Sequence, residues 1–182
     1  MAKVLYVRHG QTISNVRRVF AGGEGESPLT NEGIKQAHQA GKELKSTNID
    51  KIICSPMDRT FETAMIIAEY VGFDSGKIIK DSRIKEYNAG EHRGMPTEGM
   101  TAERLVSGEG AEDPKEFAKR VHEFLKDVSE HDGVTLVVGH AATVKMIECL
   151  QTGSNPATFF DVPKLKNARV MELDLTWLSS DK

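Results

Sequence analysis

The chain has few cysteines and no long apolar run, and each shortage excludes a class of protein. Only two cysteines, Cys54 and Cys149, occur in 182 residues, and they form no Cys-x-x-Cys pair, so no disulfide framework is indicated. The apolar run 4–7 is too short for a signal-peptide core, and no stretch approaches the roughly 20 apolar residues of a membrane span. We expect a reduced, soluble protein of the cytoplasm that does not bind membranes.

An excess of positive charge is also lacking, since 24 Lys and Arg against 27 Asp and Glu leave a formal net charge of −3. This balance provides no global field toward nucleic acid, so we expect no nucleic-acid partner. Aromatic residues contribute only 6%, but 38% hydrophobic and 28% charged residues are ordinary for a globular protein and exclude collagen-like and disordered chains. The length is typical of one domain, predicted here to span residues 1–182.

Several common site motifs are missing. The sequence has no Gly-x-x-x-x-Gly-Lys-Ser/Thr loop, no Gly-x-Gly-x-x-Gly, no Gly-x-Ser-x-Gly and no His-Glu-x-x-His. These absences argue against P-loop, dinucleotide-binding, serine hydrolase and zinc protease sites. A dinuclear metal phosphatase would place clustered Asp and His at the carboxyl ends of strands, where this chain has arginine instead. We therefore expect no metal ion.

Short apolar segments alternate with amphipathic ones along the chain. Apolar strands separated by segments with a 3.6-residue period are typical of a parallel sheet covered on both faces. Thr30 and Ser55 are expected helix N-caps, with Pro56 as the first residue of the second helix. The predicted fold is an α/β three-layer sandwich with a mostly parallel central sheet and helices on both faces. Strands are expected at 4–7, 51–54, 134–139 and 168–175, a less regular strand within 77–95, helices at 31–45, 56–71, 114–128 and 142–150, and a helical turn at 102–106.

Two of the predicted strands lead into histidine. The segment VLYVRHGQT places Arg8 and His9 at the end of the first strand, and TLVVGHAAT places His140 at the end of a later one. Ligands of open α/β sheets bind at the carboxyl ends of parallel strands, so neighbouring strands would bring the two imidazoles together. Gly10 would let the backbone turn sharply and approach a ligand, and a plain strand-end turn is an equal alternative.

Arg59 lies in the first turn of the predicted helix that Ser55 caps. A cation there is unfavourable by roughly 0.3–1 kcal/mol, because the helix dipole is positive at that end. Either Asp58 offsets this charge, or Arg59 faces an anion bound at the helix terminus. Together with Arg8 it could grip a phosphoryl group, and a neutral imidazole could attack the phosphorus to form a phosphohistidine. A carboxylic acid would then have to protonate the leaving oxygen, and the chemistry alone does not say which histidine attacks.

The motifs that carry these residues resemble those of the histidine phosphatase superfamily, whose fold is phosphoglycerate mutase-like. RHGQTISN resembles its Arg-His-Gly-x-Thr-x-x-Asn signature, PLTNEGIKQA its first-helix motif, and SPMDRTFETA its Ser-x-x-x-Arg-x-x-x-Thr-Ala motif. IKEYNAGEHRG, VVGHAA and KNARVMELDL are similar to later segments of the family, in the same order and over nearly the whole chain. The resemblance implies an enzyme without metal or nucleotide cofactor.

The resemblance also implies a role for each matching residue. His9 would be the nucleophile, and Glu86 would protonate the leaving oxygen and then activate water. Ala141 follows the second histidine where the family commonly has glycine, and it still offers a backbone N–H to phosphate. Glu91 is a nearby alternative acid without a motif, and His92 touches either substrate or water. His140 would complete the catalytic set, and the substrate phosphate would be held by Arg8, Arg59, Asn15, Thr12 or Gln11, and Ala141.

Three functions fit this pattern. A phosphatase would pass the phosphoryl group from His9 to water, whereas a mutase would return it to a phosphorylated sugar acid. Mutases of the family carry an inserted segment that excludes water, whereas residues 95–113 here are short and glycine-rich, so we favour hydrolysis of a small phosphorylated metabolite. A phosphate-binding module without turnover would lack the nucleophile or an arginine, and this sequence has both. The particular substrate and the oligomeric state stay open.

Overall fold

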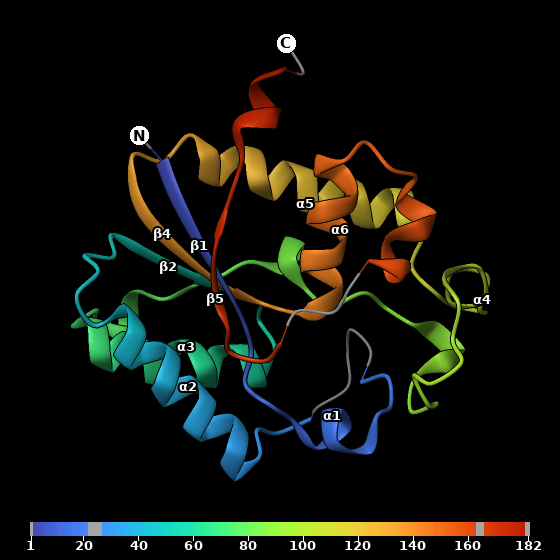
Figure 1. Ribbon diagram of the computed structural model, residues 1–182, viewed down its shortest axis with the longest axis horizontal. Helices are drawn as coiled ribbons and strands as arrows, with labels where there is room; N and C mark the ends of the chain where they lie inside the picture. The colour runs from blue at the N-terminus through green and yellow to red at the C-terminus, as the bar shows by residue number, and fades with distance from the viewer. Residues whose placement is uncertain (1, 22–26, 163–165, 181–182) are drawn as a thin grey trace.

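A twisted central sheet with helices on both sides forms the molecule (Figure 1). The computed structural model describes residues 2–21, 27–162 and 166–180. The described strands form one five-stranded sheet in the order β3-β2-β4-β1-β5, in which β5 runs antiparallel to β1 and the other pairs are parallel. The strands are β1 (Ala2–Arg8), β2 (Lys51–Cys54), β3 (Ile79–Lys80), β4 (Gly133–Gly139) and β5 (Val170–Leu173).

Alternate strand residues pack into two apolar clusters on opposite faces of the sheet. Tyr6 and Val137 belong to the cluster covered by α5 and α6, whereas Leu5 and Leu136 belong to the cluster covered by α2 and α3. Figure 1 shows these helix pairs on opposite sides of the strands. The predicted three-layer α/β fold is therefore confirmed. The long helices are α2 (Asn31–Leu44), α3 (Asp58–Val71), α5 (Pro114–Ser129) and α6 (Ala141–Gln151).

The predicted start of α3 was wrong. The helix begins at Asp58 after Met57 as N-cap, and the Ser55 side chain does not cap it. Ser55 still belongs to the sheet edge, because its backbone N–H donates to Val138 O at 3.0 Å. The Thr60 hydroxyl donates to Ser55 O at 2.7 Å, so the first helical turn is joined to the strand end by a side chain from within the helix. The predicted Thr30 cap of α2 is confirmed, since its side chain accepts from Gly33 N.

The segment between β3 and α5 has little regular structure. The predicted strand there shrinks to the two residues of β3, and the predicted helical turn is present as α4 (Ala102–Val106). Helix α1 (Ile13–Arg17), which the sequence pattern did not indicate, follows β1. A capping box between Thr12 and Asn15 stabilises its N-terminus. Among the described residues, no helix has the length and apolar character needed to cross a membrane. The short 3-10 helices are η1 (Ser75–Lys77), η2 (Ser82–Ile84), η3 (Gly90–His92), η4 (Pro156–Asp161) and η5 (Thr176–Ser180).

Candidate active site

The carboxyl ends of β1 and β4 bring the two histidines together. The parallel register pairs Arg8 with Gly139, and the His9 N–H donates to Gly139 O at 3.0 Å. The imidazole rings of His9 and His140 lie edge to face, with centroids 5.3 Å apart. The predicted convergence of the two rings is confirmed, because the strands that carry them are direct neighbours in the sheet.

The His9 ring is held in one orientation. It is 3% exposed, and its Nδ1 lies 2.7 Å from its neighbour's carbonyl, Gly10 O. A carbonyl oxygen only accepts, so the hydrogen of the neutral ring sits on Nδ1 and the lone pair on Nε2. Asn167, which the sequence analysis did not single out, donates from Nδ2 to His9 O at 2.9 Å. A ring fixed in this way presents Nε2 as its nucleophilic atom.

His140 is fully buried and stays neutral. Burial, reinforced by the positive charges of Arg59 and Arg8, holds its pKa well below the usual 6.5. Its Nε2 lies 2.8 Å from Ser55 Oγ, which is the contact that Ser55 makes in place of a helix cap. Nδ1 of His140 is buried with no hydrogen-bond partner among the described residues.

Tyr6 explains why glycine precedes the second histidine. Its hydroxyl donates to His140 O at 3.0 Å and accepts from His140 N at 2.7 Å. A Cβ at Gly139 would stand 2.2 Å from that hydroxyl oxygen, so no side chain fits there. Tyr6, which belongs to β1, thus fixes the backbone of His140 through two hydrogen bonds.

Two buried guanidinium groups flank the histidines. Arg8 and Arg59 are each 3% exposed, at the end of β1 and in the first turn of α3. Burial lowers the pKa of both side chains, and the negative charge of Glu86 acts in the opposite direction on each. Thr63 links the two elements, because its hydroxyl donates to Arg59 O at 2.7 Å and accepts from Gly10 N at 3.1 Å. Two cations in an enclosed place form a site for an anion with several oxygens.

Glu86 belongs to the same site. Its Oε1 accepts from the backbone N–H of Ala142 at 3.1 Å and of Tyr87 at 3.2 Å. The alternative acid Glu91 is exposed, and its Oε1 accepts from Glu109 N at 3.0 Å instead. The geometry therefore favours Glu86 as the carboxyl group of the site.

A cavity of about 260 Å³ joins these groups. Gln11 does not line it, because its side chain accepts from the Thr30 hydroxyl at 3.0 Å. His140 does not line the cavity, and its ring packs against that of His9. His92 is buried elsewhere, with Nε2 2.9 Å from Arg104 O, so it touches neither the cavity nor bulk water. The sequence-predicted residues that line the cavity are Arg8, His9, Thr12, Asn15, Arg59, Glu86 and Ala141.

Part of the cavity wall was not foreseen. It includes Lys145, which lies one helical turn after Ala141 on α6 and is 8% exposed. Its ammonium group donates to Phe160 O and lies 4.4 Å from the centroid of the Phe160 ring. The i, i+4 spacing from Ala141 was the available signal for Lys145. The remaining apolar lining residues are Val19, Phe20, Ala21, Tyr87, Leu105, Ala142, Phe159 and Phe160.

The arrangement suits phosphoryl chemistry. Two buried guanidinium groups, an oriented imidazole and a carboxyl group line the same cavity. Such groups can bind the oxygens of a phosphoryl group, attack its phosphorus and exchange a proton with the leaving oxygen. Within the described ranges, no group of three or more His, Cys, Asp or Glu side chains could hold a metal ion.

The fold and the site define the class to which the chain belongs: α/β proteins that pair a strand-end imidazole with buried arginines for phosphoryl groups. A sequence model of the histidine phosphatase superfamily (branch 1) matches residues 4–177. The chain is a member of this superfamily.

Two relatives and two solved structures illustrate the similarity. A Hydrogenobacter thermophilus protein provisionally named phosphoserine phosphatase 2 is 30% identical, covering 96% of this chain and 90% of its own length. A Yersinia pestis protein provisionally named phosphoglycerate mutase GpmB is 32% identical, covering 99% of this chain and 89% of its own. Bacillus stearothermophilus YhfR superposes with a TM-score of 0.82 at 24% identity, covering 96% of this chain and 91% of its own. A mycobacterial glucosyl-3-phosphoglycerate phosphatase solved with VO3 gives 0.79 at 19%, covering 96% and 93%.

Proposed function

We propose that this protein is a phosphatase that hydrolyses phosphomonoesters, without a metal ion, through a phosphohistidine on His9. The observation that carries the proposal is the common cavity in which the oriented His9 ring, Arg8, Arg59 and Glu86 meet. Relatives of this chain are named both as phosphatases and as a mutase, in keeping with phosphoryl transfer at such a site.

The first step transfers the phosphoryl group to the protein. Nε2 of His9 forms a bond to phosphorus while the bond from phosphorus to the ester oxygen breaks. The guanidinium groups of Arg8 and Arg59 stabilise the charge on the phosphoryl oxygens. Glu86, protonated at this stage, gives its proton to the leaving oxygen, so that an alcohol departs.

The second step frees the enzyme. Glu86, now a carboxylate, takes a proton from a water molecule whose oxygen attacks the phosphorus, and the bond to His9 Nε2 breaks. Because Oε1 of Glu86 accepts two backbone N–H groups, the proton is carried on Oε2. The neutral His140 does not line the cavity, so we assign it a supporting role, through the edge-to-face contact of its ring with that of His9.

Hydrolysis is favoured over mutase activity. A mutase must keep water from the phosphohistidine, and from residues 95–113 only Thr97 and Leu105 line the described cavity. The substrate we propose is a small phosphorylated metabolite. We also propose the cytoplasm as the compartment, where buried free thiols such as Cys54 and Cys149 stay reduced.

The test is a panel of phosphomonoesters incubated with the protein, with free phosphate and acid-labile protein-bound phosphate both measured. The wild type is expected to release phosphate and to carry the label, and His9→Ala to lose the label and at least about 10³-fold of the turnover. His38→Ala is the matched control, because His38 bonds the Tyr70 hydroxyl outside the cavity.

The alternatives give different results in the same assay. Passage of the label to a phosphorylated sugar acid without release of phosphate would establish a mutase. Binding of phosphate with neither label nor release would establish a module without turnover.

A further inference from the structure

We propose that Arg120 and Glu112 form a positioning pair that holds Glu86 in place for proton transfer. The inference rests on the role proposed above for Glu86. Residues 85–88 belong to no helix or strand, so no ladder of backbone hydrogen bonds fixes the segment that carries this carboxyl group. A proton donor has to stay within hydrogen-bond reach of the leaving oxygen, so a group on such a segment needs other support.

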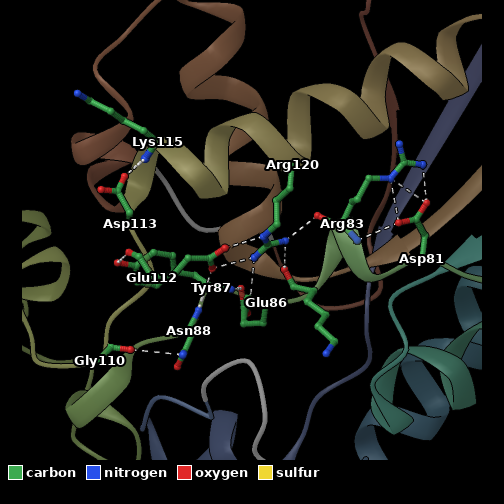
Figure 2. A network of polar contacts seen from close by, with 11 residues as sticks. Asp81, Arg83, Glu86, Tyr87, Asn88, Gly110, Glu112, Asp113, Lys115 and Arg120 are labelled. Atoms are coloured by element: carbon green, nitrogen blue, oxygen red, sulfur yellow. Dashed lines mark hydrogen bonds and ion pairs between the residues drawn. The ribbon is translucent and has the colours of Figure 1, made fainter.

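Arg120 supplies part of that support from α5. Its guanidinium group donates to three carbonyls at and just before Glu86, namely Arg83 O at 2.6 Å, Lys85 O at 2.9 Å and Glu86 O at 3.4 Å. Figure 2 shows the side chain reaching from the helix into the bend of this segment. The carbonyls before and at Glu86 are thus tied to one planar group on a rigid helix.

Glu112 supports the other side of the segment. Its carboxylate accepts hydrogen bonds from Arg120 Nε at 2.6 Å and Arg120 Nη2 at 2.9 Å. This bidentate geometry is the strongest for an arginine–carboxylate pair. The same carboxylate accepts from Asn88 N at 3.2 Å, and Glu112 N donates to Asn88 O at 2.9 Å. The Tyr87 hydroxyl donates to Glu112 O at 2.6 Å. The residues on both sides of Glu86 are therefore held by one ion pair and its backbone.

The pair is itself rigid. Its side chains are 20% and 19% exposed, and the Arg120 guanidinium lies 4.4 Å from the centroid of the buried Phe117 ring. Arg120 makes no contribution to the lining of the cavity that holds His9. Its contact with the site is made through the backbone of Glu86, which makes it a positioning residue.

Arg83 provides a matched comparison in the same segment. Its side chain forms ion pairs with Asp81 at 2.7 Å and Asp127 at 2.6 Å. It does not line the cavity. Arg83→Met removes as many charges as Arg120→Met but leaves the carbonyl at position 83 available to Arg120.

The experiment compares turnover of p-nitrophenyl phosphate, whose leaving group needs little protonation, with that of phosphoserine, whose alkoxide does. Arg120→Met is expected to lower kcat for phosphoserine about 10- to 100-fold, and kcat for p-nitrophenyl phosphate less than about 3-fold, with KM nearly unchanged. Arg83→Met should leave both substrates within about 2-fold of wild type. Arg120→Lys, which keeps a donor but not the planar fork, should fall between wild type and Arg120→Met, and it serves if the methionine variant does not fold.

Glu86→Gln separates failure of this proposal from failure of the proposed function. If Glu86→Gln slows both substrates equally, the assignment of the proton donor is wrong. If Glu86→Gln is selective for phosphoserine but Arg120→Met slows both substrates equally, only the positioning role is overturned. The double variant is expected to match Glu86→Gln alone, because a group that acts through Glu86 has nothing left to position. Multiplied losses in the double variant would overturn the positioning role.

Discussion

His140 shows how burial sets the charge of a single side chain in this site. Its pKa is depressed by burial and by the neighbouring cations, so the ring is neutral in the folded protein at pH values where an exposed imidazole is protonated. In the unfolded chain, the same ring binds a proton near pH 6.5. Below that pH the unfolded state therefore binds more protons than the folded state, so acid increases the population of the unfolded state.

Stability is accordingly expected to fall as the pH drops below about 6.5 and to be fully present above it. Between pH 7.5 and 5.5, this ring should contribute a loss of about 1 kcal/mol in the free energy of unfolding. Urea unfolding at both pH values measures the loss, which should be smaller by that amount in His140→Gln. An unchanged dependence in His140→Gln would contradict the depressed pKa.

At the scale of elements, the site depends on a close backbone contact between the loop after β1 and the start of α2. A Cβ on Gly33 would stand 2.1 Å from Gln11 O, and one on Gly10 would stand 2.3 Å from Gly33 O. Thr30, the cap of α2, donates from its backbone N–H to Gln11 O at 2.9 Å. The loop that carries His9 thus packs directly on the Pro-Leu-Thr-x-x-Gly stretch. This is possible because Gly10 and Gly33 have no Cβ that would keep the two backbone segments apart.

Gly33→Ala is expected to destabilise the protein by about 1–3 kcal/mol and to lower kcat/KM by about 10- to 100-fold, since it pushes the His9 loop from its position. Thermal unfolding and steady-state kinetics measure the two effects. Gly41→Ala, where a Cβ would meet the Tyr70 ring at 2.4 Å, should be destabilised too but keep its kcat/KM below the unfolding temperature. Equal kinetic losses in both variants would show that lost stability, and not displacement of the loop, lowers the activity.

At the scale of the whole molecule, the proposed anion site joins both faces of the sheet. Arg59 comes from α3 on one face, whereas Lys145 comes from α6 on the other, and Arg8 and His9 come from the strand between them. A ligand bound in the cavity therefore bridges elements that pack in different apolar clusters. Binding to the folded state alone stabilises the entire domain.

Inorganic phosphate at about 100 times its Kd should raise the free energy of unfolding by about 2.7 kcal/mol and Tm by about 5–10 °C. Calorimetry should show one transition, as the prediction of one domain requires. Arg59→Met should lose most of the shift, and Arg83→Met, which removes a cation outside the cavity, should keep it. A full shift in Arg59→Met would place the phosphate elsewhere, and two separate transitions would contradict the single domain.

The chain's own sequence indicated most strands and helix positions and brought out His9, His140, Arg8 and Arg59 as a candidate site. Apolar runs and caps act over a few neighbours, and the carboxyl ends of adjacent parallel strands must meet at one edge. The prediction for Ser55 failed because its sequence neighbours favour a helix cap. In the structure its hydroxyl contacts the ring of His140, which is far away in the sequence but close in the fold. Gln11 failed for a similar reason, since its side chain bonds Thr30 of the next helix.

Only the tertiary structure decided what surrounds these residues. The contact of Tyr6 with the His140 backbone, the place of Lys145 on the cavity wall and the support of Glu86 by Arg120 each join residues far apart in the chain. Such contacts leave no periodic pattern, because side chains meet across elements through packing and not through spacing. The sequence could therefore indicate the proposed reacting groups, whereas their orientation and support depended on the folded chain.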